Sequence, residues 1–300
     1  MQAYLFVHFT GEEKDGEQIY FSVSRDGLNW EDLNEGKLIL RSRIGTGGVR
    51  DPYPVRHPKT GKIYLIATDL RIEAGYGWDA AQYEGSRDLI VWESEDLVHW
   101  SKERACRVGI EGAGCVWAPE AIYDEEKEAF LVFWASMVKA PGEEQPKQRI
   151  YAAYTNDFCD YSEPFLYMER EEHVIDTTIV RARGMYYRIS KDETYKHLIL
   201  EKSTSLTGTF TQIASPILDQ LMGVEGPECY PMPDKESWCL IADQFAEGKG
   251  YLPLLTDDLG SGAFRIPKRE EYDLGKTKKR HGGVLLISEE EYERLKKAIW

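Results

Sequence analysis

Five polar residues in this 300-residue chain stand at the heads of apolar segments that look alike. Four are acids and one is a histidine, namely Asp51, Glu120, Asp176, Glu225 and His281. Their separations are 69, 56, 49 and 56 residues, which predicts an internal structural repeat. If the repeats are arranged around an axis, all five side chains point into one central funnel.

Carboxylates gathered in a funnel with aromatic rings suit the chemistry of neutral sugars. Glycoside hydrolysis needs one carboxylic acid to protonate the leaving oxygen and one carboxylate on the opposite side of the sugar. Heads on opposite blades would leave room for a water between them, which is the inverting arrangement. A third carboxylate beside the acid would raise its pKa and keep it protonated.

The segments that position these heads are typical of β-strands. An apolar, aromatic-rich run follows about ten residues after each of the first four heads, and the fifth such run lies near the other end of the chain. These runs are 62–68, 129–135, 185–190, 237–242 and 3–9. A third strand ending in an Asp, Gly or Ser turn comes next, and then a weaker fourth strand. Four strands in each of five repeats predict an all-β, five-bladed propeller.

The two ends of the chain fit a closed ring. The inner strand predicted at 280–287 has no partner downstream, and the run 3–9 supplies one, so that no strand edge is left exposed. We expect a single propeller domain over residues 1–300. Its last element is predicted to be a short C-terminal helix at 288–298. A β-sandwich is the alternative, but it does not need the same order of head, strand and turn five times.

Composition narrows the range of partners. A net charge of −15 disfavours nucleic acid and anionic membranes, and no apolar run is long enough to cross a bilayer. The five cysteines show no metal-ligand spacing and suggest reduced thiols in a cytoplasmic protein. The sequence does not predict an oligomeric state.

Five motifs together resemble glycoside hydrolase family 43, the five-bladed propellers that include α-L-arabinofuranosidases, β-xylosidases and arabinanases. In chain order they are D-P from Asp51, W-A-P-E from Trp117, I-D-T-T-I-V from Ile175, V-E-G-P from Val224 and R-H-G from Arg280. They cover nearly the whole chain. One departure is Glu120, where the family usually has Asp.

The resemblance implies a role for each head. Asp51 would be the general base, Glu225 the general acid, and Asp176 the residue that tunes the pKa of the acid and orients substrate. Trp117, Glu120, Arg50 and Arg280 would contact the sugar. His281 would lie near a calcium ion on the funnel axis. Because calcium prefers six to eight oxygen ligands, such an ion would be mostly hydrated.

Two other assignments remain open. Invertase-like fructosidases share R-D-P and E-C motifs, present here at Arg50 and Glu228, and in that interpretation Glu228 is the acid. The N-terminal nucleophile segment of those enzymes has no counterpart upstream of Asp51. A carbohydrate-binding propeller without catalysis is the other alternative, although a pure binder would not need three carboxylates.

The resemblance therefore predicts an inverting exo-glycosidase that acts on short hemicellulose oligosaccharides, such as fragments of xylan. Terminal α-L-arabinofuranosyl units are the first expectation, with β-D-xylosyl units close behind and β-D-galactofuranosyl units third. Specificity is expected in the loops 70–86, which carries Tyr76, Trp78 and Tyr83, and 137–148.

Overall fold

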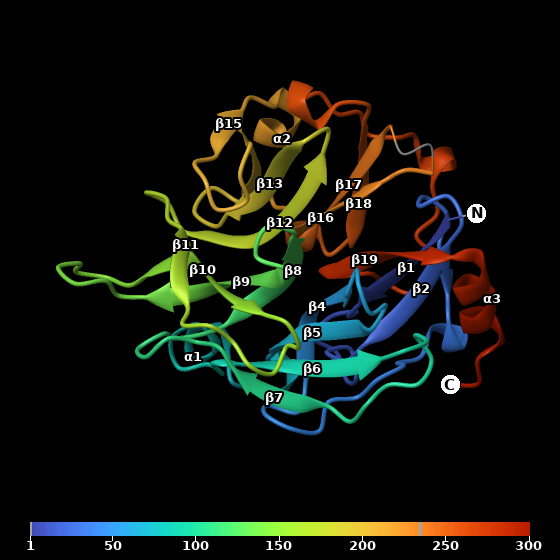
Figure 1. Ribbon diagram of the computed structural model, residues 1–300, viewed down its shortest axis with the longest axis horizontal. Helices are drawn as coiled ribbons and strands as arrows, with labels where there is room; N and C mark the ends of the chain where they lie inside the picture. Colours follow the sequence, from blue (N-terminus) through green and yellow to red (C-terminus); the bar gives the residue numbers. More distant parts are fainter. Residues whose placement is uncertain (1, 234–235) are drawn as a thin grey trace.

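Short runs of β-branched and aromatic residues form antiparallel strands, and these strands make five separate sheets around one axis (Figure 1). The structure is a computed structural model that describes residues 2–233 and 236–300. Each sheet is a blade whose first strand lies nearest the axis. The predicted five-bladed β-propeller is confirmed.

The strands follow the chain from one blade to the next. The first blade contains β4 (Val49–Arg56), β5 (Ile63–Asp69), β6 (Asp88–Ser94) and β7 (Arg104–Arg107). The second contains β8 (Trp117–Asp124), β9 (Ala129–Val138), β10 (Lys147–Thr155) and β11 (Phe165–Met168). The third contains β12 (Val174–Ala182), β13 (Met185–Asp192), β14 (His197–Ser203) and β15 (Thr211–Ile213). The fourth contains β16 (Glu225–Pro231), β17 (Trp238–Asp243) and β18 (Tyr251–Thr256).

The fifth blade is built from both ends of the chain. Its strands are β19 (Gly282–Ser288), β1 (Gln2–His8), β2 (Tyr20–Ser24) and β3 (Glu31–Asp32). Strand β1 lies between β19 and β2, in register from Gln2 opposite Ser288 to His8 opposite Gly282. The predicted closure of the ring by the N-terminal strand is therefore confirmed.

The fourth blade differs from the prediction of four strands. Within the described residues it has three, and beyond β18 the chain makes an isolated bridge between Leu255 and Arg265. This bridge covers part of the β18 edge without extending into a strand.

Short helices lie in the segments that connect or follow the strands. The α-helices are α1 (Trp78–Tyr83), α2 (Pro216–Gln220) and α3 (Glu289–Lys297). The 3₁₀ turns are η1 (Asn34–Gly36), η2 (Ile72–Ala74), η3 (Phe245–Glu247), η4 (Leu259–Ser261) and η5 (Arg269–Glu271). Helix α3 is the predicted C-terminal helix, and it begins with the expected capping box, in which Ser288 and Glu291 bond to each other's backbone N–H groups.

Apolar layers between neighbouring blades hold the ring together. One layer joins the fifth and first blades, where Leu5 and Val7 pack in the same cluster as Leu65 and Trp92. Burial of each such side chain contributes about 1.5–3 kcal/mol. The inner strands are thus fixed on rigid blades, and so are the polar residues at their heads.

Candidate active site

The polar heads open into a cavity of about 590 Å³ to which residues of all five blades contribute. Seven of the eight residues predicted to act in catalysis, substrate binding or metal binding line it. They are Arg50, Asp51, Trp117, Asp176, Glu225, Arg280 and His281. The eighth, Glu120, does not line the cavity.

A repeated backbone feature turns these heads out of the sheet. The left-handed region, with φ between 48° and 52°, is occupied by Asp51, Ala118, Asp176 and Gly226. In each blade the strand pairing shifts register at this residue. An extra residue of this kind is a β-bulge, which re-aims a side chain next to a functional site.

The positions of the bulges show which residues are equivalent in the different blades, and these differ from the residues that the sequence pattern aligns. Since Ala118 and Gly226 occupy the bulge positions of blades two and four, neither Glu120 nor Glu225 is equivalent to Asp51. Glu225 corresponds to the residue before the bulge, as Arg50 does in blade one. Glu120 corresponds to Tyr53, which lies beyond the bulge residue Asp51 on the inner strand of blade one.

Asp51 is held from two sides. Its Oδ2 accepts a hydrogen bond of 2.8 Å from the hydroxyl of Thr68, and its Oδ1 lies 3.4 Å from Nδ1 of His281. The same Thr68 hydroxyl accepts a bond of 2.8 Å from the backbone N–H of Ala118 in the next blade. Asp51 is therefore an oriented carboxylate that opens into the cavity.

Asp176 is a buried carboxyl whose Oδ2 accepts a hydrogen bond of 3.0 Å from the backbone N–H of Gly226. Burial raises the pKa of Asp176 to about 6, against the attraction of His281 and Lys191. The charges of Glu225 and Asp51 add to this rise in the pKa.

The close approach between blades four and five explains the glycine at this bulge. A Cβ on Gly226 would lie 2.5 Å from Cγ of His281. With a φ of +52° as well, this position requires a residue without a side chain.

Glu225 lies between two cations. Its Oε2 accepts a hydrogen bond of 2.9 Å from Nζ of Lys191, and its Oε1 accepts one of 2.9 Å from Nη2 of Arg280. Burial alone would raise the pKa of Glu225, but Lys191 and Arg280 outweigh it and lower that pKa to about 2. The expectation was that Asp176 keeps Glu225 protonated. The structure instead lowers the pKa of Glu225 and raises that of Asp176.

The two arginines that line the cavity are already paired with acids. Arg280 bonds Asp243 at 2.5 Å and Glu225 at 2.9 Å, and lies 3.4 Å from Glu12. Arg50 bonds Glu12 at 2.7 Å and Glu17 at 3.0 Å. Their positive charge is therefore largely compensated within the protein, which suits a neutral ligand better than an anionic one.

Two tryptophans form an apolar wall of the cavity. Trp117 and Trp78 meet edge to face with their ring centroids 6.2 Å apart. Trp78 comes from helix α1, inside the loop expected to set specificity, and is 49% exposed. Arg50 lies 5.0 Å from the centre of the Trp78 ring. Exposed aromatic faces beside carboxylates can pack against the apolar face of a sugar ring.

Glu120 and Glu228 occupy equivalent positions on the inner strands β8 and β16, and neither lines the cavity. Both are buried, and Glu228 accepts hydrogen bonds from the backbone N–H of Val284 at 2.8 Å and from the hydroxyl of Thr178 at 3.4 Å. Burial raises the pKa of Glu228 to about 8. Burial, followed by the charge of Glu228, raises the pKa of Glu120 well above its ordinary value.

Sequence reasoning missed three residues that act on the predicted heads. Thr68, Lys191 and Asp243 occupy equivalent positions on the second strands of blades one, three and four. Each contacts the next blade, through Ala118, Glu225 and Arg280 respectively. A signal was present in the sequence, since a polar residue near the end of an otherwise apolar strand is unusual.

The calcium ion implied by the resemblance finds no ready ligand set. Among residues 2–233 and 236–300, no group of three or more His, Cys, Asp or Glu side chains is arranged to hold a metal ion. Nδ1 of His281 faces the carboxylates of Asp51 and Asp176, at 3.4 and 3.9 Å. Because the imidazole is engaged with these acids, we derive no step through a metal.

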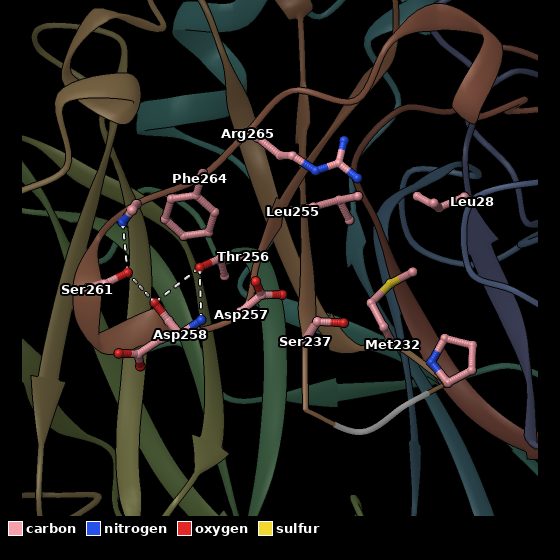
Figure 2. A pocket seen from close by; sticks show the side chains of 12 residues that line it. Leu28, Met232, Ser237, Leu255, Thr256, Asp257, Asp258, Ser261, Phe264 and Arg265 are labelled. Carbon is pink, nitrogen blue, oxygen red and sulfur yellow. Dashed lines mark hydrogen bonds between the residues drawn. The ribbon is translucent and has the colours of Figure 1, made fainter.

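A second cavity, of about 770 Å³, lies at the edge of blade four, beside β18 and the segment that follows it (Figure 2). Leu28, Met232, Leu255 and Phe264 give it apolar walls. The hydroxyls of Thr256 and Ser261 bond to the backbone of Asp258, within a turn. These two hydroxyls thus serve local structure, and the candidate site is the central cavity, where the predicted residues meet.

No helix in the described part of the chain combines the length and the apolarity needed to cross a membrane.

Comparisons with known proteins agree with this geometry. A family model related to glycoside hydrolase family 43, and described as a probable glycosyl hydrolase domain, matches residues 1–293. An α-L-arabinofuranosidase of Bifidobacterium longum is 30% identical over 290 residues, which cover 81% of this chain. The chain spans 27% of the length of that relative.

Solved structures share the fold at low sequence identity. A family 43 β-1,3-galactosidase with galactodeoxynojirimycin superposes with a TM-score of 0.62 at 15% identity, over 91% of this chain and 92% of its own. An α-L-arabinanase mutant from Cellvibrio cellulosa gives a TM-score of 0.60 at 14% identity, over 93% and 95%.

Proposed function

This chain belongs to the glycoside hydrolase 43-related family, and from that premise we propose that it is an inverting exo-glycosidase. Its first substrates would be terminal α-L-arabinofuranosyl units of short hemicellulose oligosaccharides. The observation that carries the proposal is the convergence of Asp51, Asp176 and Glu225 on one cavity with an aromatic wall. The relative named as an α-L-arabinofuranosidase supports this choice of sugar.

The proposed reaction uses the carboxylates in different roles. Asp51, oriented by Thr68, takes a proton from a water molecule as that water attacks the anomeric carbon. An acid on the other side gives a proton to the leaving oxygen, so that the glycosidic bond breaks as the bond to water forms. The sugar is released with inverted configuration.

Two carboxyls compete for the role of acid. Family resemblance favours Glu225, which would have to take up a proton when the glycoside enters, because Lys191 and Arg280 hold its pKa low. The pKa of Asp176, raised to about 6, favours Asp176. In the first assignment, Asp176 holds the Gly226 backbone and so fixes the position of Glu225.

Leaving-group dependence separates the two assignments. A general acid matters most when the leaving group is poor. We expect the acid variant, Glu225→Gln, to lose about 10²–10⁴-fold in kcat on an oligosaccharide but much less on a 4-nitrophenyl glycoside. Asp51→Asn should lose activity on both. If Asp176→Asn shows the leaving-group contrast and Glu225→Gln does not, Asp176 is the acid.

The identity of the sugar is tested with three aryl glycosides, the α-L-arabinofuranoside, the β-D-xyloside and the β-D-galactofuranoside. Hydrolysis of the first, lost in Asp51→Asn, is the expected result. Hydrolysis of the second as well would make the enzyme dual in specificity. Binding of arabino-oligosaccharides without any hydrolysis would contradict the proposal and favour a carbohydrate-binding propeller.

A further inference from the structure

The side chain of Lys191 is enclosed in the wall of the cavity and contacts two carboxylates. Its Nζ lies 2.9 Å from Oε2 of Glu225 and 2.6 Å from Oε2 of Glu193, and it lies 4.2 Å from the centre of the Phe245 ring. Lys191 itself is only 2% exposed. A lysine with four rotatable stem bonds is rarely fixed this firmly, since ordering such a side chain costs up to about 2 kcal/mol.

The contacts of Lys191 come from two neighbouring blades. Lys191 is on β13 of blade three, Glu225 begins β16 of blade four, and Phe245 belongs to η3, which follows β17. Glu193 is itself contacted by Lys196, in the turn after β13. The lysine thus bridges blades three and four at the level of the reacting groups.

The charges around Glu225 are arranged so that it can lose its own charge without leaving a buried cation unpaired. If Glu225 takes up a proton, Lys191 keeps Glu193 as its partner, and Arg280 keeps Asp243. Breaking a buried ion pair is costly mainly because one charge is left uncompensated. Here both cations have a second carboxylate in place.

We propose that Lys191 is a positioning residue for Glu225, and that its charge, with Glu193 as its second partner, controls whether Glu225 carries a charge. The inference relies on the proposed function only for the catalytic role of Glu225. Lys191 does not touch the reacting atoms in this proposal. It holds the Glu225 carboxylate in the cavity wall and opposes its protonation until substrate enters.

Other charged groups also face Glu225 and must be held constant in any test. They are Arg280 before β19, Arg50 on β4, Asp176 on β12 and Asp243 on β17. The substitutions below leave all four unchanged.

The test follows the protonation of Glu225 directly, without using catalysis. In protein labelled with ¹³C at the glutamate Cδ, the Glu225 signal is identified as the one missing from Glu225→Gln, and it is followed from pH 8 to pH 3. In the parent and in Lys191→Arg it should stay that of a carboxylate. In Lys191→Met its midpoint should rise by about 1–3 pH units, into or close to the range measured, because a neighbouring opposite charge is lost.

Control variants make the result decisive. Lys202→Met, on β14 and outside the cavity, should leave the Glu225 signal unchanged. If Lys191→Met does not fold, Lys191→Gln removes the same charge and keeps a polar group. An unchanged Glu225 titration in the folded neutral variant would overturn the proposal, as would an equal change in Lys202→Met.

Kinetics then tests the link to the reaction. If Glu225 is the acid, activity falls as pH rises through its pKa, so a higher pKa moves the basic limb of kcat/KM to higher pH. Lys191→Met should shift this limb upward and Lys191→Arg should not. A parent without hydrolytic activity would contradict the proposed function, while the NMR result would still decide the role of Lys191.

Discussion

Thr68 donates a hydrogen bond of 2.8 Å to Asp51 from the adjacent strand of the same blade. Because Thr68 also accepts from the backbone of Ala118, its hydroxyl proton is directed at the Asp51 carboxylate. The orientation of the proposed base therefore depends on a residue that makes no contact with substrate in our proposal.

Removing this hydroxyl should weaken catalysis without unfolding the protein. We expect Thr68→Val to lower kcat by about tenfold, since one hydrogen bond contributes about 1–1.5 kcal/mol and 1.4 kcal/mol corresponds to tenfold in rate. Thr68→Ser keeps the hydroxyl and should stay within about threefold of the parent. Steady-state kinetics at one pH, with circular dichroism to verify folding, measures both. Equal losses in the two variants would mean that packing, and not the hydrogen bond, is responsible.

The tryptophan wall should affect binding more than turnover. Trp78→Ala removes a half-exposed ring that lines the cavity, and we expect KM for an oligosaccharide to rise about three- to tenfold, because an aromatic contact contributes about 0.5–1.5 kcal/mol. Ile266→Ala removes an exposed apolar side chain that does not line the cavity and serves as the control. A fall in kcat with KM unchanged would show that Trp78 positions catalytic groups instead.

The buried pair of Glu120 and Glu228 should make the protein less stable at high pH. The folded-state pKa of Glu228 is raised to about 8, above its ordinary value, so its protonated form stabilises the fold at low pH. That stability is lost as pH rises through the raised pKa. We expect the free energy of unfolding to fall by a few kcal/mol, in order of magnitude, between pH 5 and pH 9.

Urea unfolding of variants at the two pH values tests this explanation. Glu120→Gln removes the neighbouring charge and should reduce the loss of stability on going to pH 9. The exposed residue Glu111 provides a matched substitution, Glu111→Gln, which should show the same pH dependence as the parent. The explanation fails if Glu120→Gln and Glu111→Gln behave alike.

The cysteines should differ sharply in reactivity. All five are free thiols, and Cys159 is exposed whereas the other four are buried. Burial raises the pKa of Cys115 to about 11 and that of Cys239 to about 12, which suppresses the reactive thiolate. A thiol reagent should therefore modify one cysteine in the native protein and five in denaturant. Rapid modification of two or more native thiols would contradict this.

The sequence predicted the architecture because each blade repeats its signals. The inner strands and the turns at their ends depend on local patterns of apolar and turn-forming residues, and the pairing of the N-terminal run with residues 280–287 follows because each lacks another partner. Even the capping of helix α3 was visible as Ser288 and Glu291. Such local features depend on residues that are close together in the sequence, so the sequence alone can predict them.

The register of the site could not be predicted, because it depends on bulges. A bulge is a feature of the backbone and does not require a particular side chain. In blade two the bulge residue is Ala118, whose side chain has no functional group. The repeat pattern therefore pointed to Glu120, the nearest acid, for the substrate site, and in the structure Glu120 does not line the cavity. In blade four the same effect set Glu225 one residue before the bulge at Gly226.

The ionic environment of Glu225 was equally out of reach of the sequence. Lys191 and Arg280 come from positions 34 and 55 residues away and meet at Glu225 only after three blades have packed. Whether an acid beside a catalytic carboxylate raises its pKa depends on the cations also present. Here two cations outweigh the carboxylates.

The closure of the ring between β1 and β19 also sets an order of events during synthesis. Within the propeller, the strand that completes the ring follows all the others in the sequence and its partner precedes them, so their pairing is among the most distant contacts in the propeller. Arg280 and His281 arrive with it. A growing chain can assemble four blades and still lack the arginine and histidine of the site, so the candidate site is completed only when the last inner strand of the propeller has been made.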